Sequence, residues 1–97
     1  MHFSIESGKL LGCHVRGDVN QSITTTLNQL KIATCGAYCA DQGYRVFAMS
    51  KETSECACDN SIGINEVDLT SCSKTCGSAK EPCGGSGLQS VYTTGRY

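Results

Sequence analysis

The sequence is poor in the large aromatic side chains that often fill a protein core. It has no Trp, two Phe and four Tyr among 97 residues, so we expect a core built mainly from small aliphatic side chains. A chain of this length also buries little apolar surface and has little stability to spare. Both shortages predict a single domain that needs covalent support to stay folded.

Long runs of charge and of apolar residues are also absent. Eight basic and nine acidic residues are mixed along the chain, which gives a formal net charge of −1. Nucleic acids and anionic membranes need a clustered basic footprint, so we expect neither as a partner. No stretch approaches the roughly 18 apolar residues of a membrane span, so we expect no membrane insertion by this segment. Residues 1–12 lack the basic start and apolar middle of a signal peptide. If the chain is exported, we expect its signal peptide to have been removed already.

Cysteine, by contrast, is abundant. The eight Cys are an even number and about 8% of the chain, as is typical of short secreted disulfide scaffolds. Four bridges at about 2 to 4 kcal/mol each would supply more stability than such a domain usually has in total. We therefore predict that the disulfides decide whether the chain folds.

The stretch from Cys35 to Cys58 organises the rest of the chain. Cys35 and Cys39 are four residues apart, as on one face of a helix, whereas Cys56 and Cys58 are two apart, as on one face of a strand. Two thiols on a helix can thus be joined to two thiols on a strand beneath it. The spacing alone leaves parallel and crossed pairing open, because eight cysteines can pair in many ways.

Local patterns predict one main helix on a short antiparallel sheet, a small disulfide-rich α+β fold. The helix has Asn28 as its N-cap and ends at Gln42, with Gly43 in the left-handed position beyond it. The predicted strands are 9–16, 44–49, 55–59 and 88–93, the last able to pair with the first. The predicted loops and turns are 17–26, 50–54, 60–66 and 77–87. Cysteines four apart predict one or two helical turns in 68–76. We expect a single domain over residues 9–94, a disordered extension at 1–8 and a tail at 95–97.

Seven short motifs together resemble the WSC domain, a cysteine-rich extracellular module of fungal cell-wall stress sensors that also occurs in secreted oxidases and animal receptors. The motifs are L-L-G-C at 10–13, C-x-x-x-C at 35–39, G-Y-x-x-F-A at 43–48, E-C-x-C at 55–58, C-x-x-x-C at 72–76, C-G-G at 83–85 and S-V-Y at 90–92. All eight cysteines fall in the family's order, over nearly the whole chain.

The resemblance implies a PAN/apple-like α+β fold and a secreted, cell-surface or cell-wall protein. It implies four disulfides, namely Cys13–Cys72, Cys35–Cys56, Cys39–Cys58 and Cys76–Cys83. It also implies a module that binds β-glucan or a related cell-wall polysaccharide without hydrolysing it, with no cofactor. The family usually has an aromatic residue between the two strand cysteines and Gly after them, where this chain has Ala57 and Asp59.

Tyrosines are the side chains best suited to contact a sugar, because a phenol has an apolar face and a polar edge. We predict such contacts for Tyr44 and Tyr92, with Tyr38 as a partly buried third candidate and Phe47 in the core. Polar side chains near these rings could hydrogen-bond sugar hydroxyls: Arg45, Asp59, Asn60 and Gln89. A protein-interaction or weakly self-associating module is the alternative, since the family also occurs in animal receptors.

Other chemistries have weaker support in the sequence. The eight thiols could hold two zinc ions, but the usual C-x-x-C pairs are missing. No His is framed by a nucleophile motif, and we expect His14 to be a surface or edge-strand residue. Four carboxylates could in principle cleave a glycoside, but a chain this short has little room for a cleft, so we expect no enzyme activity. These are Glu52, Glu55, Asp59 and Glu66.

Two further short motifs are present. Asn20 begins an N-glycosylation sequon, and Arg16-Gly17-Asp18 matches an integrin-binding tripeptide. Both patterns arise often by chance. Asn20 nevertheless remains a candidate glycosylation site, consistent with export.

Overall fold

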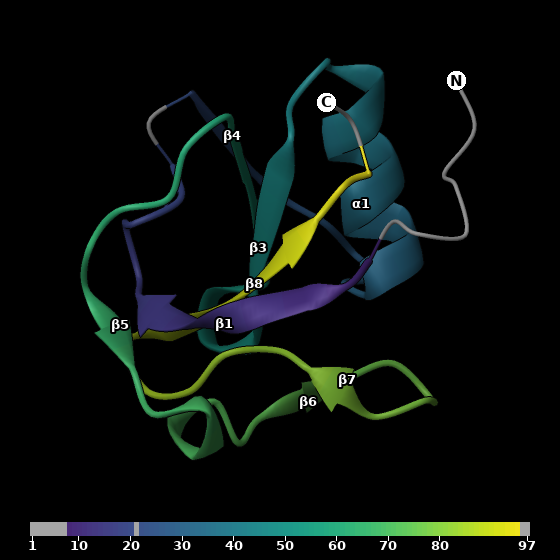
Figure 1. Cartoon of the computed structure of the whole chain (residues 1–97). Helices are drawn as coiled ribbons and strands as arrows, with labels where there is room; N and C mark the ends of the chain where they lie inside the picture. The colour runs from purple at the N-terminus through teal and green to yellow at the C-terminus, as the bar shows by residue number, and fades with distance from the viewer. Residues whose placement is uncertain (1–7, 21, 96–97) are drawn as a thin grey trace.

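A six-stranded antiparallel sheet forms the centre of the structure, a computed structural model that describes residues 8–20 and 22–95 (Figure 1). Its strands, in spatial order, are β2 (Ile23–Thr26), β4 (Glu55–Asp59), β3 (Val46–Ser50), β8 (Leu88–Thr93), β1 (Leu10–Val15) and β5 (Glu66–Val67). The single α-helix in this part of the chain, α1 (Ile32–Asp41), packs against β3 and β4. This arrangement confirms the predicted fold class.

Side chains alternate between the two faces of the sheet, and both faces are covered. On the helix face, Phe47 lies opposite Cys58 on β4 and Tyr92 on β8 in the strand register. These residues form the main core with Met49, Cys56 and the two helix cysteines. On the other face, Val46, Ala48, Ala57 and Val91 form a second, smaller core. Val19 and Ile62, from two loops, cover that second core.

The disulfides join this sheet to the segments around it. They are Cys13–Cys72, Cys35–Cys56, Cys39–Cys58 and Cys76–Cys83, so all eight cysteines are paired. The two bridges from α1 to β4 are parallel rather than crossed. The connectivity is the one implied by the resemblance to the WSC domain.

Two predictions about the chain before α1 were wrong. Residues 23–26 form the edge strand β2 rather than a loop, because Ile23 packs on the core while the threonines pair with β4. The helix starts after Lys31 rather than Asn28. Thr34 accounts for this shift, since its hydroxyl accepts the Lys31 N–H (3.2 Å) and reaches the Gln29 carbonyl (2.6 Å). At the other end, Gly43 has the predicted left-handed backbone, with φ of 91°.

The segment between β5 and β8 also differs from its prediction. Only a single 3-10 turn, η2 (Leu69–Ser71), follows Asp68, whose carboxylate accepts the Thr70 N–H. The rest of the segment predicted to be helical, residues 72–76, is extended, because a disulfide joins Cys76 to Cys83 across a hairpin. That hairpin pairs β6 (Thr75–Cys76) with β7 (Glu81–Pro82) inside the predicted loop 77–87. A proline is tolerated there because the strand is at an edge.

The remaining boundaries differ by a few residues. The predicted loop 60–66 ends in β5, the strand predicted at 44–49 begins at Val46, and the turn after it contains the 3-10 helix η1 (Lys51–Thr53). Residues 1–7 of the predicted extension and 96–97 of the predicted tail lie outside the described residues. Within the described part, no helix is long and apolar enough to cross a membrane.

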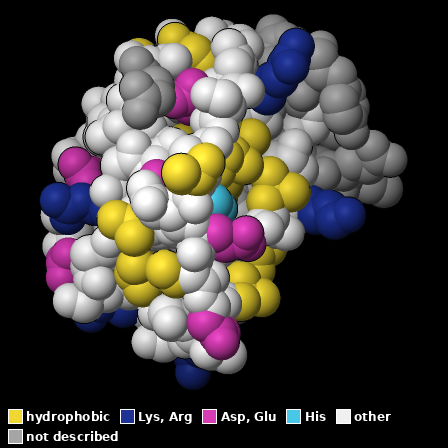
Figure 2. All heavy atoms as spheres, turned by 60° about the vertical axis from the view of Figure 1, so that its left-hand side comes forward, with side chains coloured by type: hydrophobic (Ala, Val, Ile, Leu, Met, Phe, Trp, Pro, Cys, Tyr) yellow, Lys and Arg dark blue, Asp and Glu magenta, His cyan; other side chains and the backbone are white. Residues whose placement is uncertain are grey.

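One face of the molecule carries several exposed hydrophobic side chains. Figure 2 shows hydrophobic side chains at the surface on the side of the molecule that contains β5. Ile64, before β5, is 95% exposed, and Leu69, in η2, is 52% exposed. Leu11 and Val15 on the neighbouring strand β1 are 43% and 41% exposed. This apolar surface lies at the β1–β5 side of the sheet.

Candidate functional site

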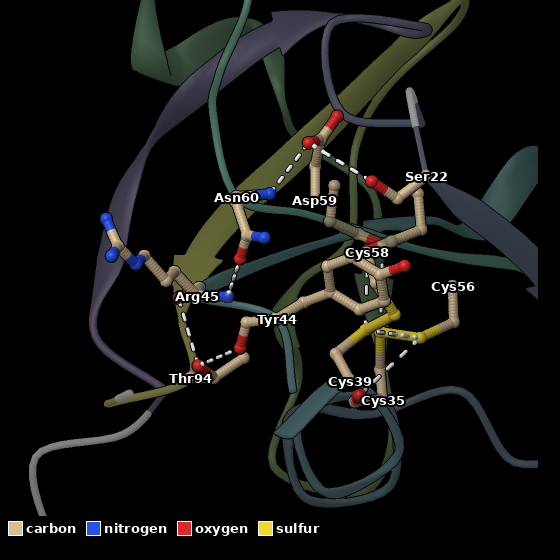
Figure 3. The surroundings of a disulfide bond; sticks show 12 residues. Ser22, Cys35, Cys39, Tyr44, Arg45, Cys56, Cys58, Asp59, Asn60 and Thr94 are labelled. Carbon is tan, nitrogen blue, oxygen red and sulfur yellow. Dashed lines mark hydrogen bonds between the residues drawn. A yellow bond between two sulfur atoms is a disulfide. The ribbon is translucent and has the colours of Figure 1, made fainter. Parts of the chain in front are cut away.

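One end of the central sheet brings together four of the predicted sugar-binding residues. Tyr44 and Arg45 immediately precede β3, and Asp59 and Asn60 stand at the end of β4. The strands are antiparallel neighbours, with Val46 paired to Asp59, so these ends meet (Figure 3). The Arg45 N–H donates to the Asn60 side-chain oxygen (3.0 Å). The structure thus brings four of the predicted residues together, and we call them the sheet-end site: Tyr44, Arg45, Asp59 and Asn60.

The backbone of the sheet-end site is held firmly on both sides. The Tyr44 N–H donates to the Cys39 carbonyl at the end of α1 (3.0 Å). On the other side, the Thr94 N–H donates to the Arg45 carbonyl (2.9 Å), and its hydroxyl lies 2.7 Å from the Tyr44 carbonyl. The helix end and the end of β8 thus fix the position of Tyr44.

The Tyr44 ring is partly buried and packs on the main core. Figure 3 shows it beside Cys58 and the disulfides of Cys39 and Cys35. The Tyr38 side chain on α1 is also partly buried against the same core, as predicted. Each of these two rings therefore combines a packed side with some exposed surface, which is the arrangement that a sugar-stacking ring needs.

Asp59 has a structural role in the sheet-end site. It is 4% exposed. Its Oδ1 accepts the N–H groups of Asn60 (2.7 Å) and Ser61 (3.3 Å), and the Ser22 hydroxyl lies 3.5 Å away. Asp59 was predicted to bind sugar hydroxyls. The structure instead uses its carboxylate to close the turn after β4.

Tyr92 was also predicted to contact sugar, and the structure places it in the core. It is 1% exposed, because β8 is a central strand and Tyr92 points toward the helix. Its ring stacks on Phe47, confirming the predicted core position of Phe47, and its hydroxyl donates to the Pro82 carbonyl. Burial, followed by the charge of Glu81, raises the pKa of Tyr92. No face of this ring is available for stacking.

Gln89 lies on the other face of the sheet, away from the sheet-end site. It is 2% exposed, and its side-chain oxygen accepts the Val19 N–H (2.8 Å). It lines a cavity of about 200 Å³ together with Arg16, Thr24, Glu55 and Ala57. Ala57 occupies the position at which the family usually has an aromatic residue. The small side chain therefore leaves a hollow beside the second core.

A buried polar cluster on this second face was missed from the sequence. The His14 Nδ1 lies 2.9 Å from the Asp18 carboxylate, and Asn65 donates to that carboxylate through both its N–H (2.7 Å) and its side chain (3.0 Å). Burial raises the pKa of Asp18, but the hydrogen bonds from His14 and Asn65 outweigh it, so the net pKa is lowered. The four-residue spacing of His14 and Asp18 was the available signal.

This cluster corrects the prediction for His14 and argues against the integrin-binding reading of Arg16-Gly17-Asp18. His14 is buried on β1, which has neighbours on both sides, so it is neither a surface nor an edge-strand residue. Asp18 is 7% exposed and already accepts three hydrogen bonds. Its carboxylate is therefore not presented to a receptor as an integrin-binding tripeptide requires.

The cysteines provide no metal site. The sulfurs of Cys35, Cys39 and Cys56 lie within 4.8 Å of one another, but they belong to two adjacent disulfides. A metal needs thiolates, which disulfide sulfurs cannot supply. The zinc alternative is therefore wrong for the oxidised protein.

The four carboxylates considered for glycoside cleavage are dispersed. Glu52 and Glu55 pair with Arg16 at 3.7 and 3.5 Å, and Asp59 is buried at the end of β4. Glu66 lies at the far edge of the sheet, on β5. Asn20, the predicted glycosylation site, is exposed, whereas Gln21 of its sequon lies outside the described residues.

Comparison with known proteins identifies the family of this chain. The WSC domain family matches residues 10–85, most of the chain. This chain belongs to the WSC domain family. The WSC domain is a module of cell-surface and cell-wall proteins, typically a non-catalytic sensor or binding unit. A disulfide-rich WSC domain fits an extracellular or cell-surface protein.

The chain is also similar to a protein of Chaetomium globosum described as a "Putative fungistatic metabolite". The two are 34% identical over 70 residues, which are 69% of this chain and 31% of that protein. The chain thus spans about a third of the length of this relative.

Proposed function

We propose that this WSC domain binds β-glucan or a related cell-wall polysaccharide without hydrolysing it. The observation that supports this best is Tyr44, a partly exposed ring held at the end of a rigid sheet. A phenol ring offers an apolar face to a pyranose ring. Because the backbone around Tyr44 is already fixed, binding would order little of the protein and lose little entropy.

Two polar side chains come from the same end of the sheet and could bind a sugar. Arg45 and Asn60 are both exposed. Within residues 8–20 and 22–95, the Arg45 guanidinium forms no ion pair, and the Asn60 side chain uses its oxygen for the Arg45 N–H. The guanidinium and the Asn60 amide nitrogen can therefore donate hydrogen bonds to sugar hydroxyls.

A single site of this size would bind weakly, because few ligand atoms would be buried. Retention on a wall would then come from several modules, or several copies of one protein, on the same polymer. This favours a role in anchoring or sensing.

Absence of cleavage is a separate part of the proposal, supported by the separation of Asp59 and Glu66 from the two glutamates that pair with Arg16. We expect no new reducing ends when the domain is incubated with soluble glucan.

Retention on insoluble β-glucan, chitin and xylan tests the proposal. The oxidised wild-type domain should be retained on one of these more than a non-binding protein of the same size. Tyr44→Ala should lose most of this retention, whereas Tyr44→Phe, which keeps the ring, should preserve it. Ile64→Ala is a matched control that removes an exposed side chain elsewhere. Wild-type protein that washes off all three polymers would refute the proposal.

A second candidate function is protein interaction or self-association. The exposed side chains of Leu11, Val15, Ile64 and Leu69 favour it, because apolar surface gathered on one face often marks an interaction site. It predicts concentration-dependent dimers in analytical ultracentrifugation that Ile64→Asp disrupts and soluble glycans do not. A strictly monomeric protein whose retention is competed by soluble glycan would count against it.

A further inference from the structure

A cavity of about 400 Å³ opens where three segments meet, at the opposite end of β3 from Tyr44. The segments are 28–31 before α1, the turn 51–54 after β3, and the start of the β6–β7 hairpin at 76–78. Six of its lining residues have polar side chains: Asn28, Gln29, Lys31, Lys51, Ser54 and Ser78. None of the predicted sugar-binding residues lines it.

The cavity is positively charged. Lys31 and Lys51 both line it, and no acidic residue does. Neither lysine forms an ion pair within the described part of the chain. Two unneutralised cations at one concave surface favour an anionic group.

Three acidic side chains from segments around the cavity have partners of their own. Glu52 and Glu55, in and just after the turn that carries Lys51, pair with Arg16. The Glu52 carboxylate also accepts the Gly87 N–H (3.2 Å). Glu81 accepts the Ile32 N–H at the start of α1 (2.7 Å). The three carboxylates thus have partners other than the two lysines.

The walls of the cavity are held in place by the fold. The aliphatic part of the Lys31 side chain lies against Gly77. A Cβ atom added at Gly77 would be 3.5 Å from the Lys31 Cβ. Gly77 has φ of 73°, which favours glycine at this point of the hairpin. The Lys51 N–H donates to the Cys83 carbonyl (2.8 Å), and Cys83 is bridged to Cys76 in the cavity wall. Both lysines are therefore connected to the β6–β7 hairpin, which the Cys76–Cys83 disulfide holds in place.

We propose that this cavity binds an acidic saccharide unit, a pyranose ring that carries a carboxylate, as in the uronic acids. The two ammonium groups would bind the carboxylate, while the amides and serine hydroxyls would bind ring hydroxyls. Tyr44 and Lys51 are seven residues apart across an extended strand, roughly 20 Å. The cavity is therefore a separate subsite, and its role does not depend on the one proposed for Tyr44.

Amide chemical-shift titration with an oligogalacturonate, the acidic trimer of galacturonic acid, tests this inference. A neutral glucose trimer is the comparison. We expect the acidic trimer to perturb the amides of Ser54, Gly77 and Ser78, and the neutral trimer to perturb them much less. Lys31→Gln and Lys51→Gln should each weaken binding by about two- to fivefold, as expected for the loss of one exposed ion pair. Lys9→Gln removes the same charge far from the cavity and should leave affinity unchanged. Raised salt should weaken binding, because screening acts on exposed charges.

The possible results separate this inference from the sheet-end proposal. Tyr44→Ala should leave the oligogalacturonate titration unchanged, even where it abolishes retention on β-glucan. Equal perturbation by the neutral trimer, or full affinity in the Lys31→Gln/Lys51→Gln double variant, would overturn the inference. No perturbation of the cavity amides by oligogalacturonate would overturn it as well. Both substitutions keep a polar side chain, and a mass-spectrometric map of the four native disulfide pairs shows whether the variants are folded.

Discussion

The rings of Phe47 and Tyr92 are stacked, with their centroids 5.2 Å apart and their planes 13° from parallel. This contact joins β3 to β8 in the middle of the helix face. The Tyr92 hydroxyl extends it by donating to the Pro82 carbonyl on β7. One tyrosine thus connects the main sheet to the small hairpin, and its role is structural.

Substitution of Tyr92 should therefore change stability rather than binding. Tyr92→Phe should lower the free energy of unfolding by about 1 kcal/mol, because it removes one hydrogen bond and leaves the Pro82 carbonyl unpaired. Tyr92→Ala should cost about 3 to 5 kcal/mol, as is usual when a buried aromatic ring is removed. Denaturant unfolding with intact disulfides measures both. Loss of glucan retention in a fully folded Tyr92→Phe protein would contradict this assignment.

The hydrogen bonds to Asp18 should make the domain sensitive to acid. Its pKa is lower in the folded state than in the unfolded chain, so its stabilising effect is complete above about pH 4 and is lost as the pH falls further. We expect Asp18→Asn to be less stable than wild type at pH 7. Between pH 5 and pH 2, the variant should lose less stability than wild type does.

Asp41→Asn, at the exposed end of α1, is the matched control for that experiment. It should leave both the stability at pH 7 and its fall in acid close to the wild-type values. An Asp18→Asn variant whose stability falls in acid as steeply as that of wild type would show that the cluster does not carry the effect.

The four disulfides should differ in what they contribute. Cys13–Cys72 closes a separation of 59 residues, and Cys76–Cys83 closes one of 7. Chain entropy assigns about 4 kcal/mol to the first and about 2 kcal/mol to the second. Paired Cys→Ala variants, compared by denaturant unfolding, test this order. If both pairs cost the same, the bridges stabilise the native state rather than restrict the unfolded one.

Ala57 suggests a gain-of-function experiment. It is 3% exposed at the edge of a cavity of about 200 Å³. The related domains usually have an aromatic residue at this position. We expect Ala57→Tyr to fold with all four disulfides, with its ring reaching into the cavity, and to be retained more strongly on glucan. Ala57→Leu fills space without a phenol and is the control. Failure of Ala57→Tyr to form its disulfides would show that the hollow cannot hold a ring.

Cysteine spacing predicted the most reliable features of this fold. Four-residue and two-residue spacings correctly placed Cys35 and Cys39 on a helix above Cys56 and Cys58 on a strand. The same reasoning misplaced Cys72 and Cys76, because their partners lie in separate elements, Cys13 on β1 and Cys83 after β7, and the segment between them is extended. The edge strand β2 was missed because its I-T-T-T sequence has only one residue that packs on the core.

The candidate site was predicted in part. Tyr44, Arg45, Asp59 and Asn60 lie at adjacent strand ends, so a correct hairpin prediction was enough to bring them together. Tyr92 and Gln89 were misassigned because the burial of a strand depends on its neighbours in the sheet. The sequence alone did not predict the order of the strands. The lysine-lined cavity was missed for a similar reason, since Lys31, Lys51 and Ser78 come from three distant segments.

Retention of wild type and Tyr44→Ala on insoluble β-glucan is the most direct test of the central claim, that this WSC domain binds wall polysaccharide at the end of its sheet. The account predicts that wild type is retained and that Tyr44→Ala, folded and fully disulfide-bonded, is released. Equal retention of the two proteins would contradict the assignment of the site. Release of both would contradict β-glucan as the ligand.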